Sequence, residues 1–315
     1  MYLYNKVVRD KVCTMSGSPT IFRDPDQAIE AFKAHGQSGI RIMSLTSFRW
    51  DVAIRNYGMV SAFSTRLTPT IFDVGGLHDT TLFSIVAEGS PPVFRNGVET
   101  TEHDIIIYGF NADLCCRVNY PRTRLLAVAI PNKEISRLFD EPLPISQKIR
   151  PSAASLRKLR HTHRAAIAGN GSQSGLVYAT INCLETAENV VKFRDSNRAR
   201  TVFRFQGLLE NNHCWPRFLD DICAELGVHE RTLRRACTDY LGINPHEYIT
   251  CFRLNMVRQV LKRAGFATRV SDIAAEYGFN DHGRFARLYR QCFGELPSDT
   301  LRSYAASSAA TARRK

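Results

Sequence analysis

The chain has 315 residues, more than one compact core needs, so its length predicts about two domains joined by a connector. Hydrophobic residues make up 44% of it and charged residues 23%, a composition that excludes global disorder. No apolar run approaches the roughly 18 residues that span a bilayer, and the opening MYLYNKVVRDKVCT lacks the apolar core of a signal peptide. We therefore expect a cytoplasmic protein that does not bind a membrane.

The formal net charge of +12 indicates a polyanionic partner. Acidic and basic residues balance over residues 1–146, and the positive excess lies on residues 147–204 and in the terminal ARRK. Residues 212–304 are almost balanced, so a nucleic-acid interface there depends on where the individual arginines fall.

The nine cysteines are odd in number and form no CxxC pair, which argues against a disulfide framework or a zinc site. Reduced, mostly buried thiols are the better expectation. The neighbouring Cys115 and Cys116 leave oxidant sensing open as an alternative, because in an alternating strand one would point inward and the other outward.

The N-terminal half begins with a predicted helix over residues 24–35, which Asp24 caps and Gly36 ends. Short β-rich runs separated by Gly, Pro, Asn and Asp follow over residues 39–130, and they predict an antiparallel barrel or sandwich. The pair Asn96-Gly97 predicts a two-residue hairpin.

The proline-rich EPLPISQKIRP marks a predicted domain boundary near residue 150. Helices are expected over residues 152–168 and 176–195, either packed on the β domain, paired between subunits or serving only as a linker. Apolar residues of the second helix are expected near one face: Leu176, Ile181, Leu184, and Val190 or Val191.

The C-terminal third repeats itself after about 51 residues. The first copy reads FLDDICAELGVHERTLRRACTDYLGINP and the second RVSDIAAEYGFNDHGRFARLYRQCFGELP. Gly227 and Gly278 end the first helix of each copy, and a second amphipathic helix follows after a short turn. Each copy is therefore a predicted helix-turn-helix, whose second helix enters the DNA major groove.

The second helix of each copy carries apolar residues on an inner face and basic residues on an outer face. The inward residues are Leu233, Ala236 and Cys237 in the first copy, and Phe285, Leu288, Tyr289 and Cys292 in the second. The candidate DNA-binding residues are Arg231, Thr232, Arg234, Arg235, His282, Arg284 and Arg287.

Arginine suits this role because its fork reaches guanine O6 and N7 together and also grips phosphates. The alternative is a solvated helix face whose arginines pair with Asp220, Asp221 or Asp239, and only the repeat favours DNA over it. Residues expected in the core, rather than stacked on bases, are Phe218, Ile222, Leu233, Ile273, Tyr277 and Phe285.

One helix is predicted between the copies, from Pro245 to Arg263. At about 1.5 Å per residue it spans about 28 Å. Two reading heads held at that distance are compatible with successive major-groove faces about 34 Å apart.

Residues 212–303 resemble the DNA-binding domain of the AraC/XylS family of bacterial transcription regulators. The resemblance rests on RTLRRACTDYLGINPHEYI, RLNMVRQVL and SDIAAEYGFNDHGRFARLYRQCFGELPS, in that order. Two features depart from the family pattern: Gly283 stands where a polar residue is common, and LPSDTLR replaces the usual Pro-Ser-x-Tyr-Arg ending. Gly283 weakens the distal helix by up to about 1 kcal/mol, so we expect the distal head to depend on phosphates more than the proximal one.

The resemblance also implies a cupin-like effector-binding domain over residues 39–135. His78 and His103 stand apart, and His161 and His163 are expected on a solvated helix, so no metal, cofactor or enzyme activity is predicted. The effector-binding residues are not identified, although aromatic side chains are candidates for lining a pocket and equally for an ordinary core. These are Trp50, Phe72, Phe83, Phe94, Tyr108 and Phe110.

The predicted fold class is α+β, with four segments along the chain. They are a cupin-like β-barrel sensing domain (1–146), a helical connector with a dimerisation role (147–211), a DNA-binding domain with two helix-turn-helix units joined by a long helix (212–304), and a disordered basic tail (305–315).

The predicted function is that of a sequence-specific transcriptional activator controlled by a small-molecule effector. Its expected partners are double-stranded promoter DNA, the effector, RNA polymerase and a second copy of the chain. The alternative is a DNA-binding regulator whose β domain only dimerises, and a metal-dependent enzyme fused to a DNA-binding module is a third, less favoured class.

Overall fold

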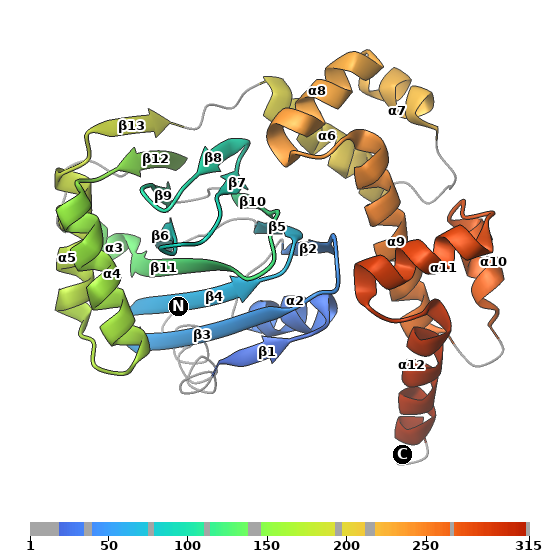
Figure 1. The fold of residues 1–315 in the computed structure, drawn as a ribbon, viewed down its shortest axis with the longest axis horizontal. Helices are drawn as coiled ribbons and strands as arrows, with labels where there is room; N and C mark the ends of the chain where they lie inside the picture. The colour runs from blue at the N-terminus through green and yellow to red at the C-terminus, as the bar shows by residue number, and fades with distance from the viewer. Residues whose placement is uncertain are drawn as a thin grey trace. The chain divides into compact units, whose positions relative to one another are not determined.

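The computed structural model describes residues 19–34, 40–74, 79–109, 114–137, 146–192, 197–211, 218–264 and 268–312. The chain forms two compact units (Figure 1). The first comprises Met1–Ile42 and Arg49–Arg194, and the second comprises Met43–Phe48 and Asp195–Lys315. Antiparallel strands followed by helices confirm the predicted α+β class.

The first unit contains two antiparallel sheets. The larger has the strand order β1-β3-β4-β11-β6-β9-β12-β13 and the smaller β2-β5-β10-β7-β8. The strands are β1 (Thr20–Phe22), β2 (Arg41–Ser44), β3 (Trp50–Tyr57), β4 (Val60–Leu67), β5 (Thr70–Val74), β6 (Thr80–Val86), β7 (Val93–Arg95), β8 (Val98–Thr100), β9 (Ile105–Tyr108), β10 (Leu114–Val118), β11 (Thr123–Pro131), β12 (Ser146–Arg150) and β13 (Asn189–Lys192).

In this unit, the residues that were predicted to start a helix and to form a hairpin do so. Asp24 precedes α2 (Pro25–Ala34), and its carboxylate accepts a hydrogen bond from the N–H of Asp26 at 3.0 Å. Asn96 and Gly97 have φ angles of 47° and 75° and join β7 to β8, which confirms the hairpin. The short α3 (Asn132–Ile135) follows β11 directly.

The helices α4 (Ala153–Ile167) and α5 (Gln173–Glu185) belong to the first unit, although their segment was predicted to be a connector. Leu159 and Leu176 are fully buried in one core cluster with strand residues such as Phe83. The compact units divide the chain near residue 194, and long-range packing attaches these helices to the larger sheet, which is one of the three arrangements expected for them.

The end of the predicted second helix is wrong. The helix α5 stops at Glu185, and Val190 and Val191 lie in β13, which pairs with β12. Both valines are exposed, at 53% and 45%, so they do not continue the apolar face that begins at Leu176.

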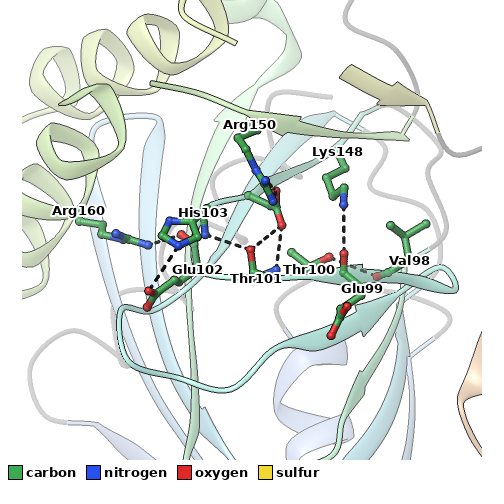
Figure 2. Close-up of polar contacts among 10 residues, drawn as sticks. Val98, Glu99, Thr100, Thr101, Glu102, His103, Lys148, Arg150 and Arg160 are labelled. Carbon is green, nitrogen blue, oxygen red and sulfur yellow. Dashed lines mark hydrogen bonds and ion pairs between the residues drawn. The ribbon is translucent and has the colours of Figure 1, made fainter. Parts of the chain in front are cut away.

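A polar network fastens β12 and α4 to the connection between β8 and β9 (Figure 2). The buried carboxylate of Asp104 accepts hydrogen bonds from the Thr101 hydroxyl at 2.8 Å and from Nη2 of Arg150 at 2.8 Å. Arg160 on α4 donates to the carbonyl oxygen of Glu102. Burial alone would raise the pKa of Asp104, but hydrogen bonds from Thr101 and Arg150 outweigh it and lower that pKa.

Two predictions about reactive side chains are corrected. Cys115 and Cys116 are both buried, at 3% and 1% exposure, because both faces of β10 are covered. Burial raises the pKa of Cys116 to about 11, so its thiol stays protonated and the oxidant-sensing alternative loses its exposed thiolate. His163 is also buried rather than solvated, with Nε2 2.9 Å from the carbonyl oxygen of Phe63, and burial lowers its pKa.

The second unit is helical. Its helices are α6 (Asn197–Asn211), α7 (Leu219–Leu226), α8 (Glu230–Leu241), α9 (Pro245–Arg263), α10 (Val270–Glu276), α11 (His282–Phe293) and α12 (Pro297–Ala312). The bounds of α9 are those predicted. The backbone of α12 is helical to Ala312, which contradicts a disordered tail from residue 305, while residues 313–315 lie outside the described part. None of the described helices has the length and apolar character of a membrane span.

The core of the second unit matches the predicted list with one exception. Ile222, Leu233, Ile273 and Phe285 are buried and Tyr277 is half-buried. Phe218 is 70% exposed, because it lies in the extended N-cap position before α7 and outside the helical periodicity that selects the core.

Candidate nucleic-acid interface

The proximal head consists of α7 and α8 joined at Gly227. Gly227 has a φ of 65°, and this left-handed turn ends α7 before the chain enters α8 at Glu230. Leu233, Ala236 and Cys237 are buried beneath α8, as predicted. Its exposed face carries Arg231, Thr232, Arg234 and Arg235.

Acidic neighbours engage two of the proximal arginines. Arg234 forms an ion pair with Glu230, one turn earlier on α8. Arg235 lies 3.7 Å from Asp239, whose carboxylate is also 2.8 Å from Arg198 on α6. These pairs are exposed and contribute little to stability, so the side chains can exchange a carboxylate for a phosphate or a base at small cost.

The distal head consists of α10 and α11. Asp281 caps α11, because its carboxylate accepts a hydrogen bond from the N–H of Arg284 at 2.9 Å. Phe285 and Tyr289 are buried, and their ring centroids lie 5.7 Å apart. The other predicted inward residues also face the core cluster: Cys292 is buried and Leu288 is partly buried.

The outer face of the distal head is basic. His282, Arg284 and Arg287 are exposed. Among the residues that the structure describes, neither arginine side chain forms an ion pair, and Arg231 of the proximal head forms none either. Contact between DNA and these three arginines would therefore break no internal salt bridge.

The long helix α9 connects the two heads, and polar contacts fix its ends. Asn244 caps its start by accepting a hydrogen bond from the N–H of Glu247 at 2.9 Å. Near its other end the half-buried Arg258–Glu295 ion pair spans 3.2 Å. Leu254, Val257 and Leu261 of α9 are buried in the distal core cluster, so the distal head is packed directly on this helix.

The helix α6 is a support for the proximal head that the sequence analysis placed in the connector. The rings of Phe203 and Tyr240 are 5.6 Å apart, and those of Phe205 and Tyr248 are 5.4 Å apart. Gln206 also donates a hydrogen bond to the Tyr248 hydroxyl at 3.0 Å. The sequence feature that could have predicted this helix is the recurrence of apolar residues every three or four positions: Ala199, Val202, Phe205 and Leu209.

No described group of three or more His, Cys, Asp or Glu side chains is arranged to hold a metal ion. His103 is exposed beside Glu102 at 3.8 Å, and His78 lies outside the described residues. Of the candidate pocket aromatics, Phe94 is half-buried and Phe110 is not described. The remainder are buried: Trp50, Phe72, Phe83 and Tyr108.

Two helix-turn-helix units with basic outer faces define a DNA-binding protein of the helix-turn-helix class. Residues 222–303 match the model of a family described as a helix-turn-helix domain. A Pseudomonas putida relative, XylDLEGF operon transcriptional activator 2, is 36% identical over 110 residues, which cover 30% of this chain and 70% of that protein. XylDLEGF operon transcriptional activator 1 is 42% identical over 125 residues, but the match spans only 39% of its length.

The chain belongs to the AraC/XylS family of DNA-binding transcriptional regulators. Among solved structures, an AraC-type regulator from Chromobacterium violaceum is 30% identical, with 34% of this chain and 93% of that chain covered and a TM-score of 0.31. ToxT from Vibrio cholerae is 14% identical over 84% of this chain and 96% of its own, with a TM-score of 0.30.

Proposed function

We propose that this protein activates transcription by binding a specific promoter sequence through both heads, under the control of a small molecule in the first unit. The DNA-binding step is supported by one observation, which is that the second helices of the two heads have the same geometry. Each head buries one face of its second helix and leaves arginines exposed on the other, at Arg231 and Arg234 in α8 and at Arg284 and Arg287 in α11.

The length of α9 supports binding of both heads to one DNA molecule. Its 19 residues span about 28 Å, close to the separation of successive major-groove faces on one side of a duplex. Buried contacts at its distal end hold that head rigidly on α9. We expect the chain to cover two adjacent groove segments in a single footprint.

The heads differ in how their arginines are engaged. Arg234 and Arg235 already have carboxylate partners, which hold their side chains on the surface of α8. Arg284 and Arg287 have none among the described residues, and Gly283 beside them contributes no side chain at the start of α11. We propose that α8 reads bases and that α11 mainly contacts phosphates.

Control by a small molecule requires two sites and an equilibrium that both influence. The family supports this role for the first unit, and recruitment of RNA polymerase and pairing with a second copy are part of the same proposal. The second candidate is a β unit that only dimerises. A ligand that stabilises the full chain against heat would favour control by an effector over dimerisation alone.

The DNA proposal is tested by footprinting the full chain on the DNA upstream of its own gene. The variant Arg231→Ala/Arg234→Ala/Arg235→Ala should lose the footprint, and Arg234→Ala alone should weaken binding by about 1 to 3 kcal/mol if it reads a base. The control is Arg157→Ala/Lys158→Ala/Arg164→Ala, which removes the same charge from exposed positions of α4.

Conservative variants separate base reading from phosphate contact. Lysine keeps the charge but loses the planar fork, so Arg234→Lys should relax sequence preference while Arg287→Lys should leave it unchanged. Equal affinity of the wild type and the triple α8 variant, at matched salt, would refute the proximal head as a reading head.

A further inference from the structure

A surface pocket of about 520 Å³ lies where β3, β4 and β11 of the larger sheet meet at one end. Three arginines line it: Arg49 precedes β3, Arg66 is near the end of β4, and Arg122 precedes β11. The other lining residues are Leu67, Thr68 and Pro121. The volume is in the range of small-molecule sites, about 300 to 1,000 Å³. Neither head uses these residues, so the pocket needs a separate explanation.

The three arginines of the pocket differ in how the fold engages them. Arg49 is paired with Asp51, whose two carboxylate oxygens accept hydrogen bonds from Nε at 2.8 Å and from Nη2 at 3.2 Å. Arg66 and Arg122 are exposed, and neither side chain has a hydrogen bond or an ion pair with any residue that the structure describes. Two guanidinium groups in the pocket wall are therefore available to a ligand.

The strand register places a further positive charge beside the pocket. Arg66 of β4 is directly opposite Arg124 of β11, and like charges in this arrangement destabilise a sheet. On its other side Arg66 is opposite Asp51 of β3, but the carboxylate of Asp51 is already paired with Arg49. This unfavourable pair is expected if an anion from outside the chain balances it.

The backbone of Arg122 supports a role for its side chain. Arg122 has a φ of 63° and follows Pro121 in the turn before β11, a position that turns usually give to Gly or Asn. The other described residue with a positive φ that is not glycine is Asn96, and Asn tolerates this conformation. Strain of this kind gathers at ligand sites, where the side chain has a use that glycine cannot supply.

The charge of the pocket matches a phosphoryl group better than a single carboxylate. Three arginines and one aspartate leave a surplus of two positive charges. A phosphate monoester carries about −1.5 to −2 at neutral pH, and its oxygens match the parallel N–H donors of the guanidinium fork. A DNA duplex is convex, whereas this site is a hollow of small-molecule size, which favours a small phosphorylated molecule.

We propose that Arg66 and Arg122, together with Arg49, bind the phosphoryl group of a small phosphorylated molecule, such as a nucleotide or a sugar phosphate, in this surface pocket. The organic part of the ligand lies against Pro121. The inference rests on neither head, because every residue that lines the pocket belongs to the first unit.

The first test needs no ligand. Full-length Arg122→Gly relieves the backbone strain and removes one charge from the cluster, so it should melt at the wild-type temperature or up to about 4 °C above it. A lower melting temperature would show that Arg122 serves the stability of the turn and would overturn the proposal.

The second test compares phosphorylated compounds with their neutral counterparts. Inorganic phosphate, pyrophosphate, AMP and glucose 6-phosphate are titrated into the full chain by calorimetry at constant ionic strength, beside adenosine and glucose. At least one phosphorylated compound should bind, and adenosine and glucose should not. Arg66→Met and Arg122→Gly should each weaken that binding by at least about tenfold, since each loses a charge-assisted contact. Arg66→Lys, which keeps the charge and loses the fork, should fall between Arg66→Met and the wild type.

Two controls separate the pocket from general attraction to a basic protein. Arg164→Met removes one charge from an exposed position of α4 in the same unit and should bind the phosphorylated compound as the wild type does. Citrate, at the same ionic strength, should bind more weakly than that compound. An equal loss in Arg164→Met, equal binding of citrate, or failure of every phosphorylated compound to bind would refute the site.

The footprint on DNA, measured without any added phosphorylated compound, separates this inference from the proposed function. The double variant Arg66→Met/Arg122→Gly should give the wild-type footprint at matched salt. A weaker footprint would show that these arginines contact DNA phosphates and would overturn the small-molecule site. Loss of specific DNA binding by the wild type would remove the proposed function and leave this inference to the calorimetry.

Discussion

Two glycines of the DNA-binding unit should respond in opposite directions to the same substitution. Gly283 occupies the first turn of α11, and a Cβ added there would meet only the Asp281 carboxylate, at 3.5 Å, an ordinary contact distance. Gly227 ends α7, and a Cβ there would meet nothing within 4 Å. The two sites thus offer similar space and differ in backbone conformation, because Gly227 has a φ of 65°.

The expected magnitudes follow from that difference. Gly283→Ala restricts the unfolded chain and suits a helical position, so it should stabilise the unit by about 0.4 to 1 kcal/mol. Gly227→Ala places a Cβ in the left-handed region and should destabilise it by about 1 to 2 kcal/mol. For a domain of this size the melting temperature should rise by about 2 to 5 °C in the first variant and fall by at least about 4 °C in the second.

The measurement is thermal and urea unfolding of the full chain, followed by far-ultraviolet circular dichroism, where the helices of the second unit give much of the signal. DNA affinity of Gly283→Ala is measured in parallel, and we expect it to be unchanged because the methyl group meets no other part of the head. If both variants lose stability, the first turn of α11 requires glycine and the capping geometry assigned to Asp281 is wrong.

Two further substitutions test the cores of the two units. Asp104→Asn should cost about 1 to 3 kcal/mol at neutral pH, since its carboxylate accepts hydrogen bonds from Thr101 and Arg150. The folded pKa of Asp104 is lowered, so its stabilisation is complete above the ordinary value of 3.8 and is lost as the pH falls through the folded pKa. The free energy of unfolding, measured at decreasing pH, should show this loss of stability in the wild type and not in Asp104→Asn. Leu233→Ala, at a fully buried position of α8, should cost about 2 to 5 kcal/mol in urea unfolding, and a smaller loss would contradict the assigned packing.

The helices of the DNA-binding unit were predictable because their signals are local. Asn244 before Pro245 starts α9, and Gly227 and Gly242 end α7 and α8 with φ angles near 65°. Each signal acts within a few residues of the element that it bounds. The inner and outer faces of α8 and α11 followed from the same helical period.

The errors of the sequence analysis arose where distant segments meet. Val190 reads as a continuation of a helix, but β12 recruits it into a strand. One of Cys115 and Cys116 was expected to point outward and His163 to lie on a solvated helix, but all three side chains are buried. The charge of Arg95 gave no warning of its burial either, because cross-strand pairing with β10 decides where it lies.

Of the candidate DNA-binding residues, the sequence identified the exposed faces and named Asp239 as one carboxylate partner, but it did not name Glu230 as the partner of Arg234. Glu230 lies one turn before Arg234, a spacing that suggests the pair, whereas the contact between Arg198 and Asp239 joins α6 to α8 across separate helices. The contribution of α6 to the proximal head therefore became visible only in the folded unit.

That contribution makes α6 a support that α8 and α9 share. The helix α6 begins at Asn197, and it is joined to α8 through Arg198 and Asp239 and to α9 through Gln206 and Tyr248. A displacement of α6 would therefore reach both the second helix of the proximal head and the long helix that carries the distal head. Such a displacement would change the orientation of the candidate DNA-binding residues of α8 without any direct contact with them.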